Sequence, residues 1–526
     1  MLQPRSGSQE HGQRQGVVPS LLLFVFFLMV FLSASSGIIA SSDGVTIFNV
    51  TQAMVERGEI SVSGENVAVG VGGKDYSRYG IALSVVAIPF YLLGKLIATF
   101  VPAHLSLLVL KGSVSLVNAV ISALACVLFA FTARRLGFSS RVSLQLTCAF
   151  AFSTFFIVYA TKSFLAQPLE TLCLLGTVYH LIAYSRDADP RRLMYAGGFC
   201  GGGILTKWVF IINLPIFAGY LLSSTQKDRW ERGLILFSAP VVAFLGLAFG
   251  YNYARFGSIL ETGYRGLYAF STPLFVGLYG LLLSSGKSLF LYAPVTLFGL
   301  ISSNLLAKRR AREAWLLLGL FAVNLLVIAQ YRDWAGEGSW GPRYLTLVLP
   351  CLILPSGSLL ESGSAAVRRI FLALTLAGLL VQFGGISVYY GTYYRIIGEF
   401  PYRTTPSDPL FLYKAHFVPN YSPAWGQLTM ALHNWRTFLN GKKPSLQVDA
   451  GATRIPLSEA DREKLIDTLD LWFAYAYYAG LPFSLCLLGM AGSLSATTVI
   501  GWKLCQAAKS MACETSISPF PDRASA

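Results

Sequence analysis

Long apolar runs alternate with short polar segments along most of the chain. Runs of about 20 apolar residues are long enough to cross a lipid bilayer as helices. The pattern predicts an all-α fold, a polytopic transmembrane bundle of about 12 spans. The predicted spans begin with runs at 17–36 and 110–132, and the others are 142–160, 166–184, 193–206, 208–224, 233–253, 288–306, 314–330, 343–360, 369–388 and 480–501.

The segment 81–101 is also apolar enough to span, but we interpret it as a helix embedded at the outer membrane surface. Pro89 in its middle and Lys95 after it are typical of an interfacial segment. Without this segment as a crossing, the basic residues gather in the short loops of one side, as the positive-inside rule requires. Both chain ends are then cytoplasmic, and the long loops face outward.

The predicted spans also divide the chain into parts. The first outer loop should contain an amphipathic helix over 44–57, a Gly-rich hairpin-like segment and the interfacial helix. Ser458–Asp461 resembles a helix start, for a helix that runs to Tyr477. LSASSG after the first run leaves a cleaved signal peptide open as an alternative. The parts are a cytoplasmic tail (1–16), a core (17–388) that includes outer loop 37–109, an outer loop or small subdomain (389–479), a last span (480–502) and a cytoplasmic tail (503–526).

Composition agrees with a membrane protein. Hydrophobic residues make up 54% of the chain and charged residues 13%, with a mean hydropathy of +0.56, whereas soluble domains carry about 25% charged residues. The net charge of +15 could indicate nucleic-acid binding, but the basic residues lie in short loops between spans, so we expect a bilayer and no nucleic acid. The eight Cys form no CxxC pair, and the five His are scattered. We therefore expect no metal and no cofactor, with a divalent ion left as an unsupported alternative.

Asp43 lies a few residues beyond the first apolar run. One interpretation is that it caps the helix predicted over 44–57. The other is that it serves as a base at the membrane–water boundary, because a carboxylate beside hydrocarbon is costly and needs a reason.

Other polar residues on the same side could hold an anionic, sugar-bearing ligand. The phrase GGKDYSRYG (72–80) offers cations and tyrosines, although an interfacial aromatic belt with snorkelling cations explains it equally well. Arg343 follows Pro342 at the mouth of a span, and Glu170 would be costly inside a span unless paired or hydrated. The candidates for donor phosphate or sugar binding are Lys74, Arg78, Tyr79, Arg265, Lys287 and Arg343, and those for lining a cavity are Lys162, Glu170, Tyr264 and Glu337.

Several phrases, taken in order, resemble the GT-C glycosyltransferases. The resemblance is to bacterial relatives of the dolichyl-phosphate-mannose protein mannosyltransferases and of the lipid A aminoarabinose transferase, over about residues 17–360. The chain departs from these families at Gln167, where an acidic residue is common, and in 389–479, which has no counterpart. The phrases are SSDG (41–44), TQAMVERGEI (51–60), GKDYSRYGIALSVVAIPFYLLG (73–94), YNYARFGSILETGY (251–264), GLYGLLLSSGKSLFLYAP (277–294) and WAGEGSWGPRYL (334–345).

The resemblance implies transfer of a hexose or pentose from a polyprenyl-phosphate carrier to an acceptor hydroxyl, usually with inversion, at the outer face of a bacterial cytoplasmic membrane. Asp43 would take the proton of the attacking hydroxyl. Arg343, or one of Lys74, Arg78 and Arg265, would stabilise the leaving phosphate. The acceptor could be a glycan, a lipid or a protein.

Two other functions are consistent with a membrane bundle. A lipid or solute transporter, including a flippase, would need charged or broken helices at mid-membrane and related halves. The sequence has few ionisable residues in mid-span and no evident repeat. A scaffold whose outer loops bind a partner would tolerate changes at Asp43 and Arg343.

Overall fold

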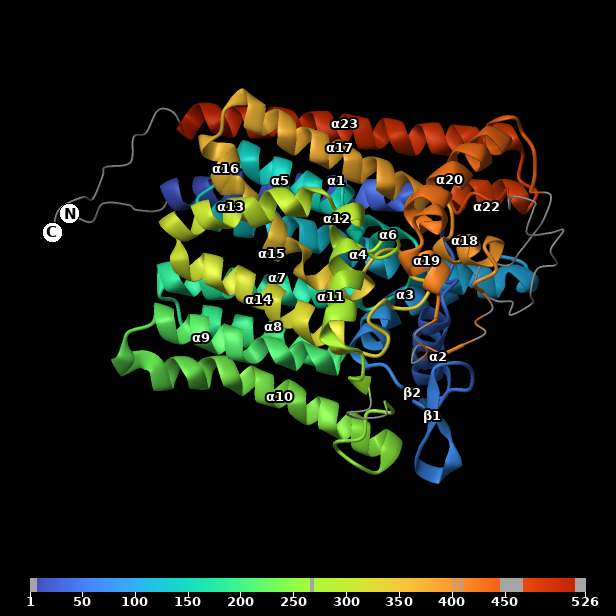
Figure 1. The fold of residues 1–526 in the computed structure, drawn as a ribbon, viewed down its shortest axis with the longest axis horizontal. Helices are drawn as coiled ribbons and strands as arrows, with labels where there is room; N and C mark the ends of the chain where they lie inside the picture. The colour runs from blue at the N-terminus through green and yellow to red at the C-terminus, as the bar shows by residue number, and fades with distance from the viewer. Residues whose placement is uncertain are drawn as a thin grey trace.

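The computed structural model describes residues 7–264, 269–400, 402, 404, 405, 408, 410–444 and 467–515. Most helices run side by side along the long axis of the molecule and form one bundle (Figure 1). The long helices are α1 (Gly7–Ala34), α4 (Ser106–Arg135), α5 (Ser140–Phe152), α7 (Gln167–Asp187), α8 (Arg191–Thr206), α9 (Leu214–Ser224), α10 (Trp230–Phe256), α13 (Val295–Arg309), α14 (Ala311–Gln330), α17 (Ala365–Ser387) and α23 (Phe483–Thr515).

Shorter elements complete the bundle or cover one end of it. Those within the bundle are α6 (Phe156–Thr161), α11 (Leu274–Leu283), α12 (Leu289–Tyr292), α15 (Leu349–Ile353) and α16 (Ser356–Ser362). Those gathered at the end that we call the hairpin end are α2 (Ser42–Glu56), β1 (Val67–Val69), β2 (Asp75–Ser77), α3 (Ala82–Ala98), α18 (Tyr390–Ile396), α19 (Tyr413–Phe417), α20 (Pro423–Leu439) and α22 (Trp472–Tyr478) (Figure 1).

The all-α class is confirmed, and the chain is a multi-pass membrane protein. In the described residues, six helical segments are long and apolar enough to cross a bilayer. The count of about 12 spans stays a prediction, since other apolar helices are shorter, among them Trp208–Ser224 and Leu274–Leu283. The six are Ala103–Arg135, Lys227–Phe256, Ala311–Gln330, Arg343–Ser362, Ala365–Ser387 and Phe483–Gln506.

Glycines allow close helix packing inside the bundle. Gly197 and Gly201 of α8 face Phe237 and Phe244 of α10, and a Cβ atom at either glycine would overlap α10. Small residues at such positions let helix backbones approach closely, which favours association where lipid supplies little hydrophobic driving force.

The basic turns meet at the end of the bundle opposite the hairpin end. Arg135, the last residue of α4, forms an ion pair with Asp187, the last residue of α7, at 2.8 Å. Gly137 lies against the Arg310 guanidinium of the turn between α13 and α14. These turns belong to the short basic loops that the sequence assigns to one side of the membrane. We call this end of the bundle the basic end.

The first loop has the predicted elements with slightly different bounds. The helix expected over 44–57 is α2, and the Gly-rich segment is an antiparallel hairpin in which Val67 pairs with Ser77. Helix α3 packs along α2, because Ser84 donates to the Ile47 carbonyl at 3.1 Å and Tyr91 donates to Glu56 at 2.5 Å. The segment 81–101 therefore lies against α2 over several turns.

The structure adds detail to the expected tails and loops and overturns one expected helix. Helix α1 begins at Gly7 and α23 extends to Thr515, so the described parts of both predicted tails are helical. Helix α11 lies between the predicted spans 233–253 and 288–306, where Gly277 allows this apolar helix to pack closely on α14 at Ala329. Residues 458–466 lie outside the described part, and 467–471 are not helical, so no single helix continues to Tyr477.

The described part of 389–479 packs directly on the core. The Asp470 backbone N–H donates to the Ser387 carbonyl at 2.8 Å, and that of Trp472 donates to the Ser35 carbonyl at 3.0 Å. The segment thus helps to build the hairpin end.

Candidate active site

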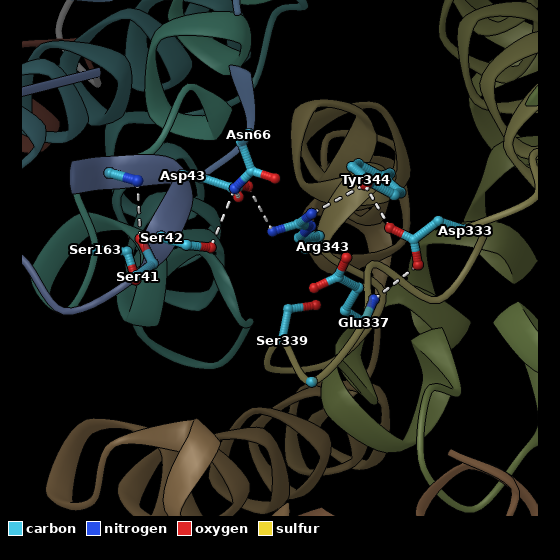
Figure 2. A network of polar contacts seen from close by, with 12 residues as sticks. Ser41, Ser42, Asp43, Asn66, Ser163, Asp333, Glu337, Ser339, Arg343 and Tyr344 are labelled. Atoms are coloured by element: carbon cyan, nitrogen blue, oxygen red, sulfur yellow. Dashed lines mark hydrogen bonds and ion pairs between the residues drawn. The ribbon is translucent and has the colours of Figure 1, made fainter. Parts of the chain in front are cut away.

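Asp43 lies in the first turn of α2 but does not cap it. The N-cap is Ser41, whose hydroxyl accepts from the Gly44 N–H at 3.2 Å. The Asp43 carboxylate instead accepts from the Asn66 side-chain amide at 3.1 Å and from Arg343 Nη1 at 3.1 Å (Figure 2). The capping interpretation is therefore wrong, and both carboxylate oxygens are oriented by side chains from other parts of the chain.

Arg343 begins a 3₁₀ segment, Arg343–Val348, directly after Pro342. Its Nη2 donates to the Tyr344 hydroxyl at 3.0 Å, and Tyr344 donates to Asp333 at 3.1 Å (Figure 2). Gly336, with φ of 67°, makes room for the guanidinium, since a Cβ atom there would stand 2.7 Å from the Arg343 side chain. The guanidinium is thus held in one place while its side chain stays 12% exposed.

Asp43 and Arg343 share one cavity of about 390 Å³ at the hairpin end. A cavity of this size falls in the roughly 300–1,000 Å³ range of small-molecule sites. Besides these two residues it is lined by Ala40, Ser41, Ser42, Glu65, Asn66, Gly336, Glu337, Gly338, Ser339, Tyr389, Tyr390, Gly391, Tyr394, Arg395, Phe400 and Tyr402. We call it the Asp43 cavity.

Glu337 is the second carboxylate to note in this cavity. Its backbone has a φ of 53°, a left-handed conformation that is uncommon for a residue other than glycine and that clusters at functional sites. Burial, and next the negative charge of Asp333, raise the pKa of Glu337 to about 7. Glu337 can therefore gain or lose a proton near neutral pH.

Tyr79 lies close to the site without lining the cavity. Burial, and next the negative charge of Asp43, raise the pKa of the Tyr79 phenol well above its usual value. The phenol is thus a neutral group beside the Asp43 carboxylate.

Two other candidates for donor binding, Lys74 and Arg78, do not reach the cavity. Lys74 forms an exposed ion pair with Glu59 at 3.6 Å, and Arg78 Nε donates to the Val67 carbonyl at 3.1 Å. Both remain on the hairpin, because local partners satisfy them. Arg265 lies outside the described residues.

Lys287 is fully buried and holds backbone instead of facing the cavity. Its ammonium group donates to the Ser339 carbonyl at 2.6 Å and contacts the Gly341 carbonyl at 3.4 Å. Lys287 therefore fixes the loop that precedes Arg343, and its expected contact with the donor phosphate would be indirect.

Three residues expected to line a cavity do not line this one. Lys162 contacts the Asp470 carbonyl and lies 4.0 Å from its carboxylate. Glu170 pairs with Lys207 at 3.8 Å, and this ion pair offsets the cost of placing a carboxylate in a span. Tyr264 is 38% exposed and lies outside the lining. Of that group, Glu337 lines the cavity.

One wall of the cavity comes from described residues between Tyr389 and Tyr402, none of which was a candidate from the sequence. Tyr389, Tyr390, Tyr394, Arg395 and Tyr402 bring aromatic rings and a second guanidinium to the cavity. The run YYGTYYR directly after a predicted span was the available signal. It is also the pattern of an interfacial aromatic belt, so the sequence alone does not distinguish the two.

The described residues contain no cluster of three or more His, Cys, Asp or Glu side chains arranged to hold a metal ion. The polar groups around Asp43 and Arg343 instead pair carboxylates with guanidinium, amide and hydroxyl groups. Such a set suits an anionic, hydroxyl-rich ligand.

Comparison with known proteins finds a family model that matches part of the chain. Residues 109–251 match the model of the family described as dolichyl-phosphate-mannose-protein mannosyltransferase. Over this segment the chain resembles the protein mannosyltransferases. The matched segment covers α4 to α10 and includes neither Asp43 nor Arg343, so the assignment of these two residues depends on the geometry.

Other comparisons are more distant. The fold is similar to the crystal structure of ArnT from Cupriavidus metallidurans bound to undecaprenyl phosphate, with a TM-score of 0.48 and 12% identity over 85% of this chain and 84% of that chain. No curated protein matches the sequence significantly.

Proposed function

We propose that this chain is a membrane glycosyltransferase that moves a sugar from a polyprenyl-phosphate donor to an acceptor hydroxyl, with inversion. The observation that carries the proposal is the placement of Asp43 beside Arg343 in one cavity. A proton acceptor and a phosphate-binding cation are the two groups that this reaction needs. The mannosyltransferase match over 109–251 supports the same class of reaction.

The two residues would divide the chemistry. Asp43 would accept the proton of the acceptor hydroxyl as the oxygen attacks the anomeric carbon, and Asn66 would keep one carboxylate oxygen oriented. The bond from the anomeric carbon to the phosphate oxygen breaks as the new bond forms. The leaving phosphate needs charge stabilisation more than a proton, and Arg343 would supply it through a guanidinium that Tyr344 and Asp43 already hold.

The basic end supports an extracytoplasmic site. The basic turns that hold Arg135 and Arg310 lie at the opposite end of the bundle from the Asp43 cavity. Short basic loops stay on the cytoplasmic side of a membrane. The cavity would then open toward the outer face of a bacterial cytoplasmic membrane, where prenyl-linked sugars and their acceptors meet.

Transfer assays with the full chain in proteoliposomes test the proposal. The donors would be polyprenyl-phosphate-linked radiolabelled hexoses and pentoses, with loss of sugar from the lipid as the readout. Asp43→Asn should lower turnover by about 10²-fold or more, the usual contribution of a general base. Asp75→Asn changes another carboxylate of the first loop, outside the cavity lining, and serves as the matched control. Full turnover in Asp43→Asn would exclude the mechanism, and movement of intact donor across the bilayer would favour a flippase.

A further inference from the structure

A second cavity of about 230 Å³ lies beside the first, on the other side of the loop 331–342. Gly336 to Ser339 of this loop line the Asp43 cavity, and Arg332 to Ala335 line the second one. We call it the Trp334 cavity. Its remaining lining comes from Ser271, Thr272, Pro273, Val276, Asp408, Phe411, His416 and Phe417.

The Trp334 cavity combines aromatic rings with charged groups. Trp334 and Phe417 have ring centroids 6.0 Å apart, and Phe411 adds a third ring. Arg332, Asp333 and Asp408 also line the space. A long hydrocarbon tail would remove water from these charged groups and offer them no polar contact in exchange, which is costly. Flat apolar faces with a few polar groups fit a ring that bears hydroxyls.

His416 supplies the decisive observation. It is 2% exposed, lines the Trp334 cavity, and its Nε2 has no hydrogen-bond partner in the described part of the chain. A buried polar atom without a partner costs about 1–3 kcal/mol, so such atoms are rare in native structures. Burial, and next the positive charge of Lys287, lower the pKa of His416 well below its usual value. The neutral imidazole can thus accept a hydrogen bond from a hydroxyl group or donate one to it, depending on its tautomer.

The two cavities are linked by hydrogen bonds. Asp333 lines the Trp334 cavity and accepts from the Tyr344 hydroxyl, which in turn accepts from Arg343. A ligand in the Trp334 cavity would therefore lie close to the residues that hold Arg343, which faces the Asp43 cavity. The volume of about 230 Å³ lies below the roughly 300 Å³ lower bound for drug-sized ligands. It suits one ring of a larger molecule.

We propose that the Trp334 cavity binds one neutral sugar ring of the acceptor, so that the acceptor is a glycan or a glycolipid. The ring would place a C–H face against Trp334 and a hydroxyl against His416 Nε2. That the ring belongs to the acceptor rests on the proposed transfer reaction, whereas the binding of a sugar ring does not.

Saturation-transfer NMR on the full chain in nanodiscs tests the binding without any donor. The probes are methyl pyranosides of glucose, galactose and mannose at millimolar concentration. At least one should give a saturating signal with the wild type and with Asp43→Asn. His416→Phe fills the cavity and should lower that signal at least fivefold. His433→Phe is the matched control, because His433 is an exposed histidine on the neighbouring helix α20, paired with Asp467.

Two results would overturn the inference. One is a wild type that binds none of the three glycosides. The other is a signal of equal size in His416→Phe and His433→Phe. Thermal unfolding of both variants shows whether the fold persists, and Trp334→Phe, which keeps a ring, should weaken binding less than His416→Phe does. If a glycoside binds to the wild type but the transfer assay shows no transfer, the proposed function is overturned. The sugar-binding site would still stand.

Discussion

The Asp43 carboxylate and the Arg343 guanidinium meet at 3.1 Å although 300 residues separate them in the sequence. The first turn of α2 supplies one partner, and the segment that follows Pro342 supplies the other. In the proposed reaction, an incoming phosphate would therefore share a guanidinium that is already paired with the Asp43 carboxylate. Donor binding and activation of the acceptor hydroxyl would be coupled through this pair in that reaction.

Replacement of Arg343 should impair donor use more than replacement of any cation on the hairpin. Arg343→Gln should lower kcat/KM for the sugar donor by about 10²-fold. This is the usual loss when one hydrogen-bonding group that stabilises a developing charge is removed. Arg343→Lys should be intermediate, because lysine keeps the charge and loses the planar fork. Initial rates over a range of donor concentrations measure both effects.

Lys74→Gln gives the comparison for that experiment. Lys74 pairs with Glu59 on the exposed hairpin, so we expect a change of less than about threefold. An effect as large as that of Arg343→Gln would mean that the hairpin folds over the cavity and that Lys74 contacts the phosphate.

Donor affinity should depend on pH through Glu337. Its pKa of about 7 lies above the ordinary glutamate value, so the side chain is neutral below pH 7 and negatively charged above it. The phosphodiester of the donor keeps its single negative charge over this range. KM for the donor should therefore rise between pH 6 and pH 8, by about tenfold for roughly 1.4 kcal/mol of repulsion.

Glu337→Gln separates this effect from other titrations. The neutral amide should keep KM near the wild-type value of pH 6 at every pH. An unchanged pH slope in Glu337→Gln would assign the titration to another group, such as Asp333.

The sequence predicted the local elements well, because each depends on a local pattern. The amphipathic period of 44–57 became α2, and the Gly-rich segment became the β1–β2 hairpin. It also marked Asp43 and Arg343 as candidates. Their pairing could not be predicted, since it depends on how distant spans pack, and no local pattern encodes that.

The same limit explains the candidates that the structure places elsewhere. Lys287 contacts the carbonyls of Ser339 and Gly341. The residues next to a lysine in the sequence do not indicate which distant backbone carbonyls it will contact. Arg395 and the Trp334 cavity come from segments whose aromatic residues also fit an interfacial belt. Tertiary packing alone turns these residues toward a cavity.

The buried pair of Lys162 and Asp470 should fix the 389–479 segment to the core. Both side chains are at most 1% exposed. Removing one partner leaves the other charge buried and unpaired, which costs about 3–5 kcal/mol. Asp470→Leu should therefore lower the unfolding temperature of the purified protein strongly, as followed by tryptophan fluorescence.

The double variant Lys162→Met/Asp470→Leu should recover most of that loss, because a well-packed apolar pair often replaces a buried ion pair without penalty. Arg192→Gln removes partly exposed pairs with Asp187 and Asp189 and should change stability by less than about 1 kcal/mol. Equal unfolding temperatures for Asp470→Leu and the double variant would show that the charge balance of this pair contributes little.

Gly299 of α13 should be essential for the packing that carries Arg343. A Cβ atom at this position would overlap the Leu352 carbonyl of α15, in the segment that begins at Arg343. Because two backbones meet there, Gly299→Ala must push the helices apart and should cost about 1–3 kcal/mol. Gly246→Ala in α10 adds the same methyl group where nothing lies within 4 Å, and alanine favours a helix by up to about 1 kcal/mol. Thermal unfolding should therefore place Gly299→Ala below the wild type and Gly246→Ala at or above it. If both variants unfolded together, contact between α13 and α15 would not limit the stability of the segment that positions Arg343.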